Sequence, residues 1–179
     1  MNRFNHWLVI LIVLLLVIHG LTGSYTLLGF PFIDIRPLPY VLAAAVVLHS
    51  LIGMFLTRDA IRIGLKTGHW YWKENARFWI VRLSGICALI LLGFHACVYT
   101  GTVNGVFFLK RFTFLRMVSQ LLFVASIAVH LVAAAKPWLI KQGVLKFEER
   151  SRNCLAVTAI LTAVFTVSII MYYIYWTGL

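Results

Sequence analysis

The residues from Phe78 to Tyr99 read FWIVRLSGICALILLGFHACVY, an apolar run with one histidine, His95, near its end. A helix needs about 20 apolar residues to cross a hydrocarbon layer roughly 30 Å thick, and this run is long enough. Within lipid an unbroken run of this length satisfies its backbone hydrogen bonds only as a helix. The stretch therefore predicts a transmembrane helix that carries a titratable side chain.

Four more apolar runs of similar length lie elsewhere in the chain. Of the 179 residues, 62% are hydrophobic and 12% are charged. A soluble domain of this size would not cover so much apolar surface. The sequence predicts one all-α membrane domain over residues 1–179, a bundle of five transmembrane helices at about 6–28, 39–56, 78–99, 115–135 and 153–176.

The basic residues predict the orientation of this bundle. The formal net charge is +11, which in a soluble protein would suggest a nucleic-acid partner. Here the charges lie between apolar runs, so no nucleic acid is expected. Arg3 and the expected loops 57–77 and 136–152 hold eleven Lys and Arg residues, against four on the other side of the membrane. Because cytoplasmic loops are enriched in Lys and Arg, we expect a cytoplasmic N-terminus and an outer C-terminus.

Histidines occur inside the first four apolar runs, one in each: His19, His49, His95 and His130. An ionisable side chain within a membrane is costly and marks a functional site, although any single one could instead bond to a neighbouring helix. Counted along alternating helices, two of them fall in the outer half of the membrane, and the other two fall near its middle and inner half. The sequence thus predicts an outer pair, His19 and His95, and an inner pair, His49 and His130.

A pair of facing imidazoles suits haem. Zinc prefers four protein ligands, whereas haem supplies four ring nitrogens and needs only two axial ligands. The chain has no Cys-x-x-Cys-His motif for covalent haem attachment. Small residues follow three of the histidines by four positions, where they would admit a flat ring or serve ordinary helix packing (Gly23, Gly53 and Ala134). The sequence predicts two b-type haems that transfer electrons.

The third run, extended to RFWIVRLSGICALILLGFHACVY over 77–99, resembles a known family. This family comprises the five-helix, dihaem cytochrome b subunits of succinate:menaquinone oxidoreductases and quinol:fumarate reductases. It has an R-x-[ST]-G motif near the inner start of the third helix, and the ligand histidine follows the arginine by thirteen residues. Arg82, Ser84, Gly85 and His95 match this pattern. The fourth run, SQLLFVASIAVHLVAAAKPW, and a fifth helix without a ligand histidine are also similar to the family.

The resemblance implies that His19 and His95 bind the iron of one haem b, and that His49 and His130 bind that of a second. It implies a multi-pass subunit of the cell's inner membrane that exchanges electrons with menaquinone near the outer haem. Its partners would be a flavoprotein subunit and an iron–sulfur subunit on the cytoplasmic side, which would hold the FAD and the iron–sulfur clusters. The chain alone has no such motif and would not be a complete enzyme. It departs from some members, which carry a glutamate where this chain has Ala128.

Three polar residues have alternative roles. Arg82 would pair with a haem propionate or extend to the inner interface, and Ser84 would bond to cofactor or backbone. Asp34, the only acid expected in an outer loop, would accept a proton from quinol or act as a solvated or capping residue. Two other functions stay open: a cytochrome b subunit of another quinone-linked oxidoreductase, of hydrogenase or b561 type, and a proton or metal transporter.

Overall fold

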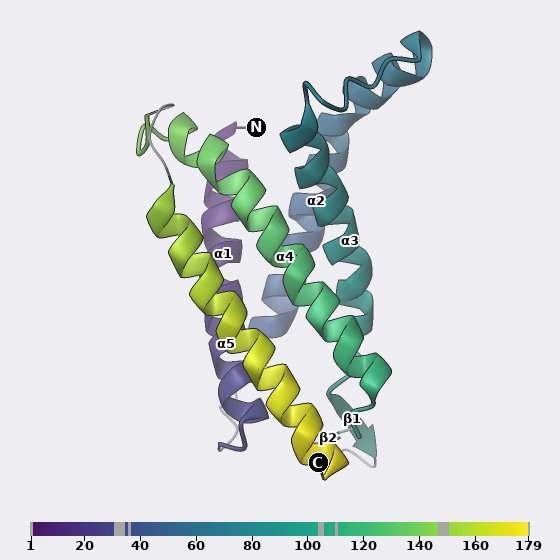
Figure 1. Ribbon diagram of the computed structural model, residues 1–179, viewed down its shortest axis with the longest axis vertical. Coiled ribbons are helices and arrows are strands. Elements are labelled where there is room, and N and C mark those ends of the chain that lie inside the picture. Colours follow the sequence, from purple (N-terminus) through teal and green to yellow (C-terminus); the bar gives the residue numbers. More distant parts are fainter. Residues whose placement is uncertain are drawn as a thin grey trace.

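The computed structural model describes residues 2–30, 35, 37–103, 106–109, 111–146 and 151–178. Its helices are α1 (Asn2–Leu27), α2 (Pro37–Thr67), α3 (Ala76–His95), α4 (Phe114–Lys141) and α5 (Arg152–Thr177). An antiparallel pair of strands, β1 (Thr100–Val103) and β2 (Val106–Leu109), lies between α3 and α4. Successive helices run in opposite directions, and the two chain ends lie at opposite ends of the bundle (Figure 1).

All five helices are long and apolar enough to cross a membrane, with mean hydropathies of 1.8 to 2.4 over their most apolar windows. Many large apolar side chains point away from the protein. Leu115 is 77% exposed and Ile160 is 63% exposed. Such surfaces are unusual on soluble proteins and are suited to contact with lipid. The prediction of five helices, each long and apolar enough to cross a membrane, is confirmed.

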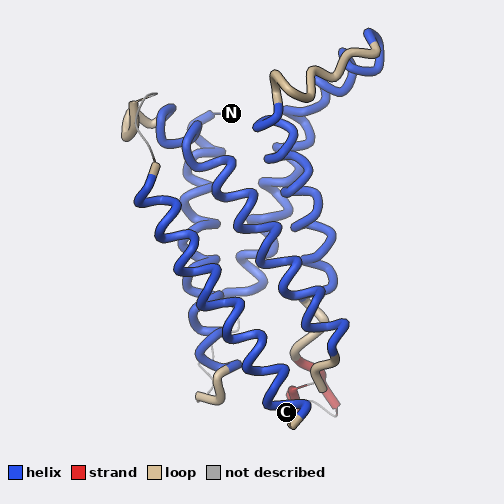
Figure 2. Tube along the Cα trace, viewed as in Figure 1, coloured by secondary structure: helices blue, strands red, loops and turns tan. Residues whose placement is uncertain are grey.

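The five helices form a closed ring. Each helix packs against the next in sequence, and α5 packs against α1. Within the described residues, helices that are not neighbours in this ring have no Cα atoms within 8 Å of each other. Directly packed helices have axes about 8–10 Å apart, so α1 and α3, or α2 and α4, meet only through long side chains. The course of the helices is traced in Figure 2.

The second helix is longer than expected. It continues past residue 56 to Thr67, so the first half of the expected loop 57–77 is helical and carries Arg58 and Arg62. Charged residues are tolerated on a helix once it leaves the hydrocarbon, and Lys66 in the last turn complements the helix dipole. The helix is followed by Gly68, whose φ of +71° suits a glycine cap.

The connection between α3 and α4 also differs from the expected one. α3 ends at His95 rather than at residue 99, and the two strands follow it. Val103 pairs with Val106, and Asn-Gly stands between them in the sequence. Asn-Gly between β-branched residues is a strong hairpin signal, which the apolar character of the region obscured. The C-terminal end of α4, away from this connection, also extends beyond the expected range. The helix runs past residue 135 to Lys141 and includes Pro137.

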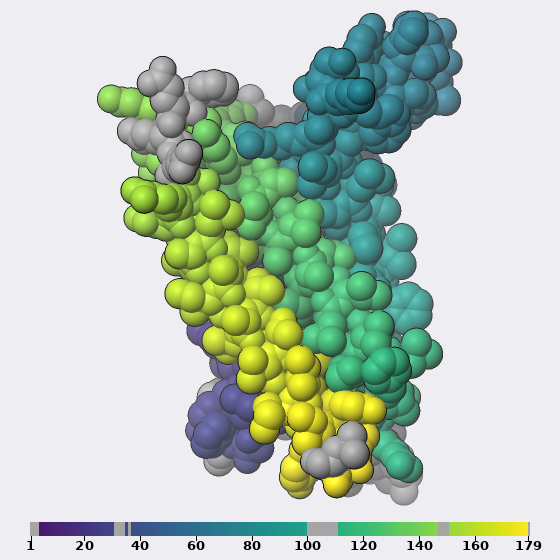
Figure 3. Space-filling view, viewed as in Figure 1, coloured from purple at the N-terminus to yellow at the C-terminus, as the bar shows by residue number. Residues whose placement is uncertain are grey.

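The basic ends of α2 and α4 lie at the same end of the bundle as the N-terminus (Figure 1). There the end of α2 and the residues after it project beyond the other helices (Figure 3). A tryptophan cluster joins this projection to the start of α3. The ring of Trp79 lies 4.6 Å from that of Trp72 and 5.7 Å from that of Trp70, between centroids, and its Nε1 donates to the Trp70 carbonyl.

The opposite end contains a buried aromatic core formed by Val98, Phe112, Ile169 and Tyr172. Phe112 is only 1% exposed. Its ring stacks on Tyr99 with centroids 5.4 Å apart and meets the edge of Tyr172 at 5.1 Å. This core therefore fastens the end of α5 to the chain on either side of the two strands.

Replacing Phe112 with Ala should lower the free energy of unfolding by about 3–5 kcal/mol, because it opens a cavity in this aromatic core. The matched control is Phe114→Ala, since Phe114 is 63% exposed and fills no such core. Unfolding of both variants in detergent micelles, followed by circular dichroism, measures the difference. Equal loss of stability in the two variants would contradict the assigned core.

Candidate functional site

The four membrane histidines meet in two pairs, and each pair crosses the interior of the helix ring. His19 of α1 faces His95 of α3, with ring centroids 6.0 Å apart and planes at 83°. His49 of α2 faces His130 of α4 at 6.4 Å and 85°. All four rings are half-buried by protein. The structure thus forms two separate sites. Their histidines are paired as the positions along the predicted spans indicate.

The two pairs lie at different levels of the bundle. On α4, Gln120 contacts His95 and lies ten residues before His130. On α3, Ser84 contacts His130 and lies eleven residues before His95. At about 1.5 Å per helical residue, both intervals separate the pairs by roughly 15 Å along the axis. Such a spacing suits two centres in series, one nearer each end of the bundle.

The His130 ring is held by the backbone of α3. Its Nδ1 donates to the Val81 carbonyl at 3.0 Å and lies 3.3 Å from Ser84 Oγ, which itself donates to the Ile80 carbonyl at 2.6 Å. A Cβ on Gly85 would stand 3.1 Å from the ring, which is a tight contact, so glycine leaves the ring room that a larger residue would reduce. With Nδ1 carrying the proton, the lone pair of Nε2 is available for a metal.

The His95 ring is held by a side chain that sequence reasoning missed. Its Nδ1 lies 2.7 Å from Oε1 of Gln120, a residue only 1% exposed. A single amide within an apolar span was the available signal, because such a group must find a partner there. The rings of Phe123 and Tyr99 pack on His95 at 4.9 and 5.6 Å. Burial raises the pKa of Tyr99, so its hydroxyl stays protonated.

Arg82 reaches from α3 toward α2, beside the His49/His130 pair. Its Nη1 is 3.3 Å from where a Cβ on Gly53 would stand, and its guanidinium lies 5.1 Å from the centre of the Phe78 ring. Its Nε is buried without a hydrogen-bond partner among the described residues. A half-buried guanidinium with an unpartnered Nε suits a carboxylate, which arginine binds through two parallel hydrogen bonds.

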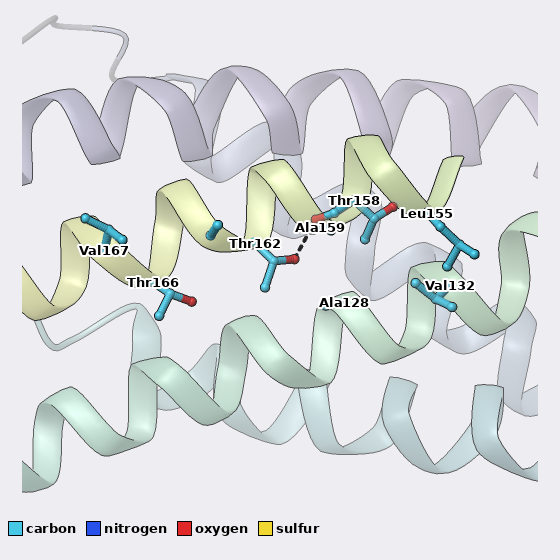
Figure 4. Close-up of a pocket in the computed structure, with 9 residues that line it drawn as sticks. Ala128, Val132, Leu155, Thr158, Ala159, Thr162, Thr166 and Val167 are labelled. Carbon is cyan, nitrogen blue, oxygen red and sulfur yellow. Dashed lines mark hydrogen bonds between the residues drawn. The ribbon is translucent and has the colours of Figure 1, made fainter. Parts of the chain in front are cut away.

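Other features are less directly tied to the pairs. Gly23 has no atom within 4 Å of an added Cβ, which leaves open space one turn beyond His19. Asp34 lies outside the described residues. A groove of about 530 Å³ between α4 and α5 is lined by Ala128 and three threonines but by none of the four histidines (Figure 4). Two of those threonine hydroxyls donate to carbonyls of their own helix (Thr158 and Thr162).

The spacing of the rings fits a metal held between them. An imidazole nitrogen lies about 1.1 Å from its ring centre and binds a metal at about 2.0 Å, so two axial imidazoles have centres about 6.2 Å apart. The described part of the chain contains no cluster of three or more histidine, cysteine or acidic side chains, which a purely protein-bound metal would need. Comparison with protein-family models, curated proteins and solved structures finds no match. The two histidine pairs are the feature of the described chain that suits a cofactor.

Replacing Gly85 with Ala should destabilise the chain relative to Gly93→Ala. Both glycines lie within α3, but a Cβ meets the His130 ring at Gly85 and nothing within 4 Å at Gly93. Alanine at Gly93 should stabilise the helix by about 0.5–1 kcal/mol, whereas at Gly85 the crowding should offset that gain. Unfolding free energies in detergent provide the measurement. Equal stabilisation of both variants would show that Gly85 is not needed for the ring.

Proposed function

We propose that this chain is a dihaem cytochrome b, the membrane anchor and electron conduit of a succinate dehydrogenase or fumarate reductase complex. The observation that carries the proposal is that two histidine pairs meet across the interior of the helix ring, at two different levels. Their ring centroids are 6.0 Å apart in one pair and 6.4 Å apart in the other. Each pair would supply both protein ligands of one haem iron, and its ring spacing fits a metal held between two imidazoles.

The residues around each pair have defined tasks in this proposal. Haem with two histidine ligands supplies one-electron transfer when bound. His19 and His95 hold one haem, and His49 and His130 hold the other. The Val81 carbonyl and the Gln120 amide orient one histidine of each pair, as outer-shell partners of metal ligands do. Arg82 binds a propionate of the haem beside His49.

The ends of the bundle have different proposed partners. The basic ends of α2 and α4 would face the cytoplasm, and the inner membrane would be the location. A flavoprotein and an iron–sulfur subunit would dock there and exchange electrons with the His49/His130 site. Menaquinone would react near the His19/His95 site, with Asp34 as a proton acceptor. The motif of Arg82, Ser84 and Gly85 with its spacing to His95 supports this choice over hydrogenase and b561-type partners.

The purified chain should contain two haems b, and each of four substitutions should remove one of them. His19→Ala and His95→Ala should abolish the same haem, and His49→Ala and His130→Ala the other, because each iron loses one axial ligand. Pyridine haemochrome assays give the stoichiometry, and reduced-minus-oxidised spectra identify which haem remains.

His69→Ala is the matched control, since His69 is exposed in the segment after α2 and should leave both haems in place. Fewer than two haems in the wild-type chain would contradict the dihaem proposal. A colourless wild-type protein would instead favour a proton or metal transporter.

Lysines of the projecting segment and of the α4 end should cross-link to the iron–sulfur subunit in the intact complex. Lys66, Lys73 and Lys141 are expected to react, because electrons must enter near the His49/His130 level. Mass spectrometry of the linked peptides identifies the partner and thereby separates the succinate, hydrogenase and b561 alternatives. Links from Lys110 alone would reverse the proposed orientation.

A further inference from the structure

We propose that Gln120 is a positioning residue that fixes the tautomer of His95 and thereby tunes the metal site at the His19/His95 level. The proposal rests on the dihaem function above and concerns a series of hydrogen bonds that begins on α4 and ends at His95 of α3. The series runs from the Arg116 carbonyl through Ser119 and Gln120 to His95.

The Arg116 carbonyl, at the start of this series, fixes which group donates and which accepts in each hydrogen bond. Ser119 Oγ lies 2.7 Å from the Arg116 carbonyl, which only accepts, so the single hydroxyl proton is donated there. Ser119 Oγ must then accept from Gln120 Nε2 at 3.1 Å. The amide nitrogen therefore faces Ser119, and the amide oxygen faces His95.

The tautomer of His95 is the consequence. Gln120 Oε1 cannot donate, so His95 Nδ1, 2.7 Å away, must carry the proton. In neutral imidazole this leaves the lone pair on Nε2, the nitrogen that would bind the metal. A carbonyl acceptor on Nδ1–H also raises the basicity of the ring as a ligand.

Burial makes this control strong and specific. Gln120 is 1% exposed, so no water substitutes for its oxygen. The other site has a different device, because His130 donates to the backbone carbonyl of Val81, which no substitution removes. The two sites therefore differ in that His95 is held by a side-chain carbonyl, whereas the shorter contact of His130 is to a backbone carbonyl, with Ser84 Oγ farther away at 3.3 Å.

Two substitutions at Gln120 should shift one redox midpoint potential in opposite directions. Gln120→Leu removes the acceptor, weakens His95 as a ligand and should move the potential of the haem that His19→Ala abolishes to more positive values. It should also weaken binding of that haem by about 10–100-fold. Gln120→Glu supplies a stronger acceptor and should move the same potential to more negative values. Neither should move the potential of the other haem.

The experiment is a spectroscopic redox titration of the purified full-length chain, with haem content measured on the same samples. Gln142→Leu is the matched control, because Gln142 is exposed at the end of α4 and should leave both potentials unchanged. If the wild type holds two haems and both Gln120 variants retain its potentials, the positioning role is wrong while the dihaem function stands. If the wild type holds no haem, the proposed function fails first.

Discussion

The reach of four side chains across a ring of helices is the constraint on which the site depends. The helices that carry each pair of histidines are not neighbours and do not touch through their backbones, yet the imidazole rings come within 6.0 and 6.4 Å. The glycines at positions 53 and 85 serve the same geometry, because they leave room for Arg82 and for the His130 ring beside the backbone.

Much of this arrangement follows from the sequence because the bilayer imposes it. The five apolar runs have the length of a membrane crossing, and a constant rise per residue is enough to put His19 level with His95. The chain beyond the hydrocarbon is less constrained, and there the expectations were wrong: α2 continues to Thr67, and α3 gives way to two strands. Gln120 was missed for a different reason, since its partner lies 25 residues away and only the packing of α3 on α4 brings them together.

The two levels of the bundle are chemically unequal. One has a guanidinium next to its histidines, and the other has a neutral amide and the aromatic rings of Phe123 and Tyr99. A nearby cation favours the form of a cofactor that carries the extra electron, and because each level has a carbonyl acceptor on one of its histidines, the guanidinium is the main electrostatic difference between them. Two otherwise identical haems in these surroundings would therefore differ in redox potential, and the site beside Arg82 would be the more readily reduced.

The order of the helices around the ring has a consequence for biogenesis. Because α1 pairs with α3 and α2 with α4, no histidine meets its partner until the helix after next has entered the bilayer. The seam between α2 and α3 is the loosest of the ring, and α5 closes the circle by packing against both α1 and α4. A cofactor that binds only the assembled ring would stabilise it by mass action. Cofactor supply during synthesis would then decide how much of the chain reaches its closed form and how much is left for proteolysis.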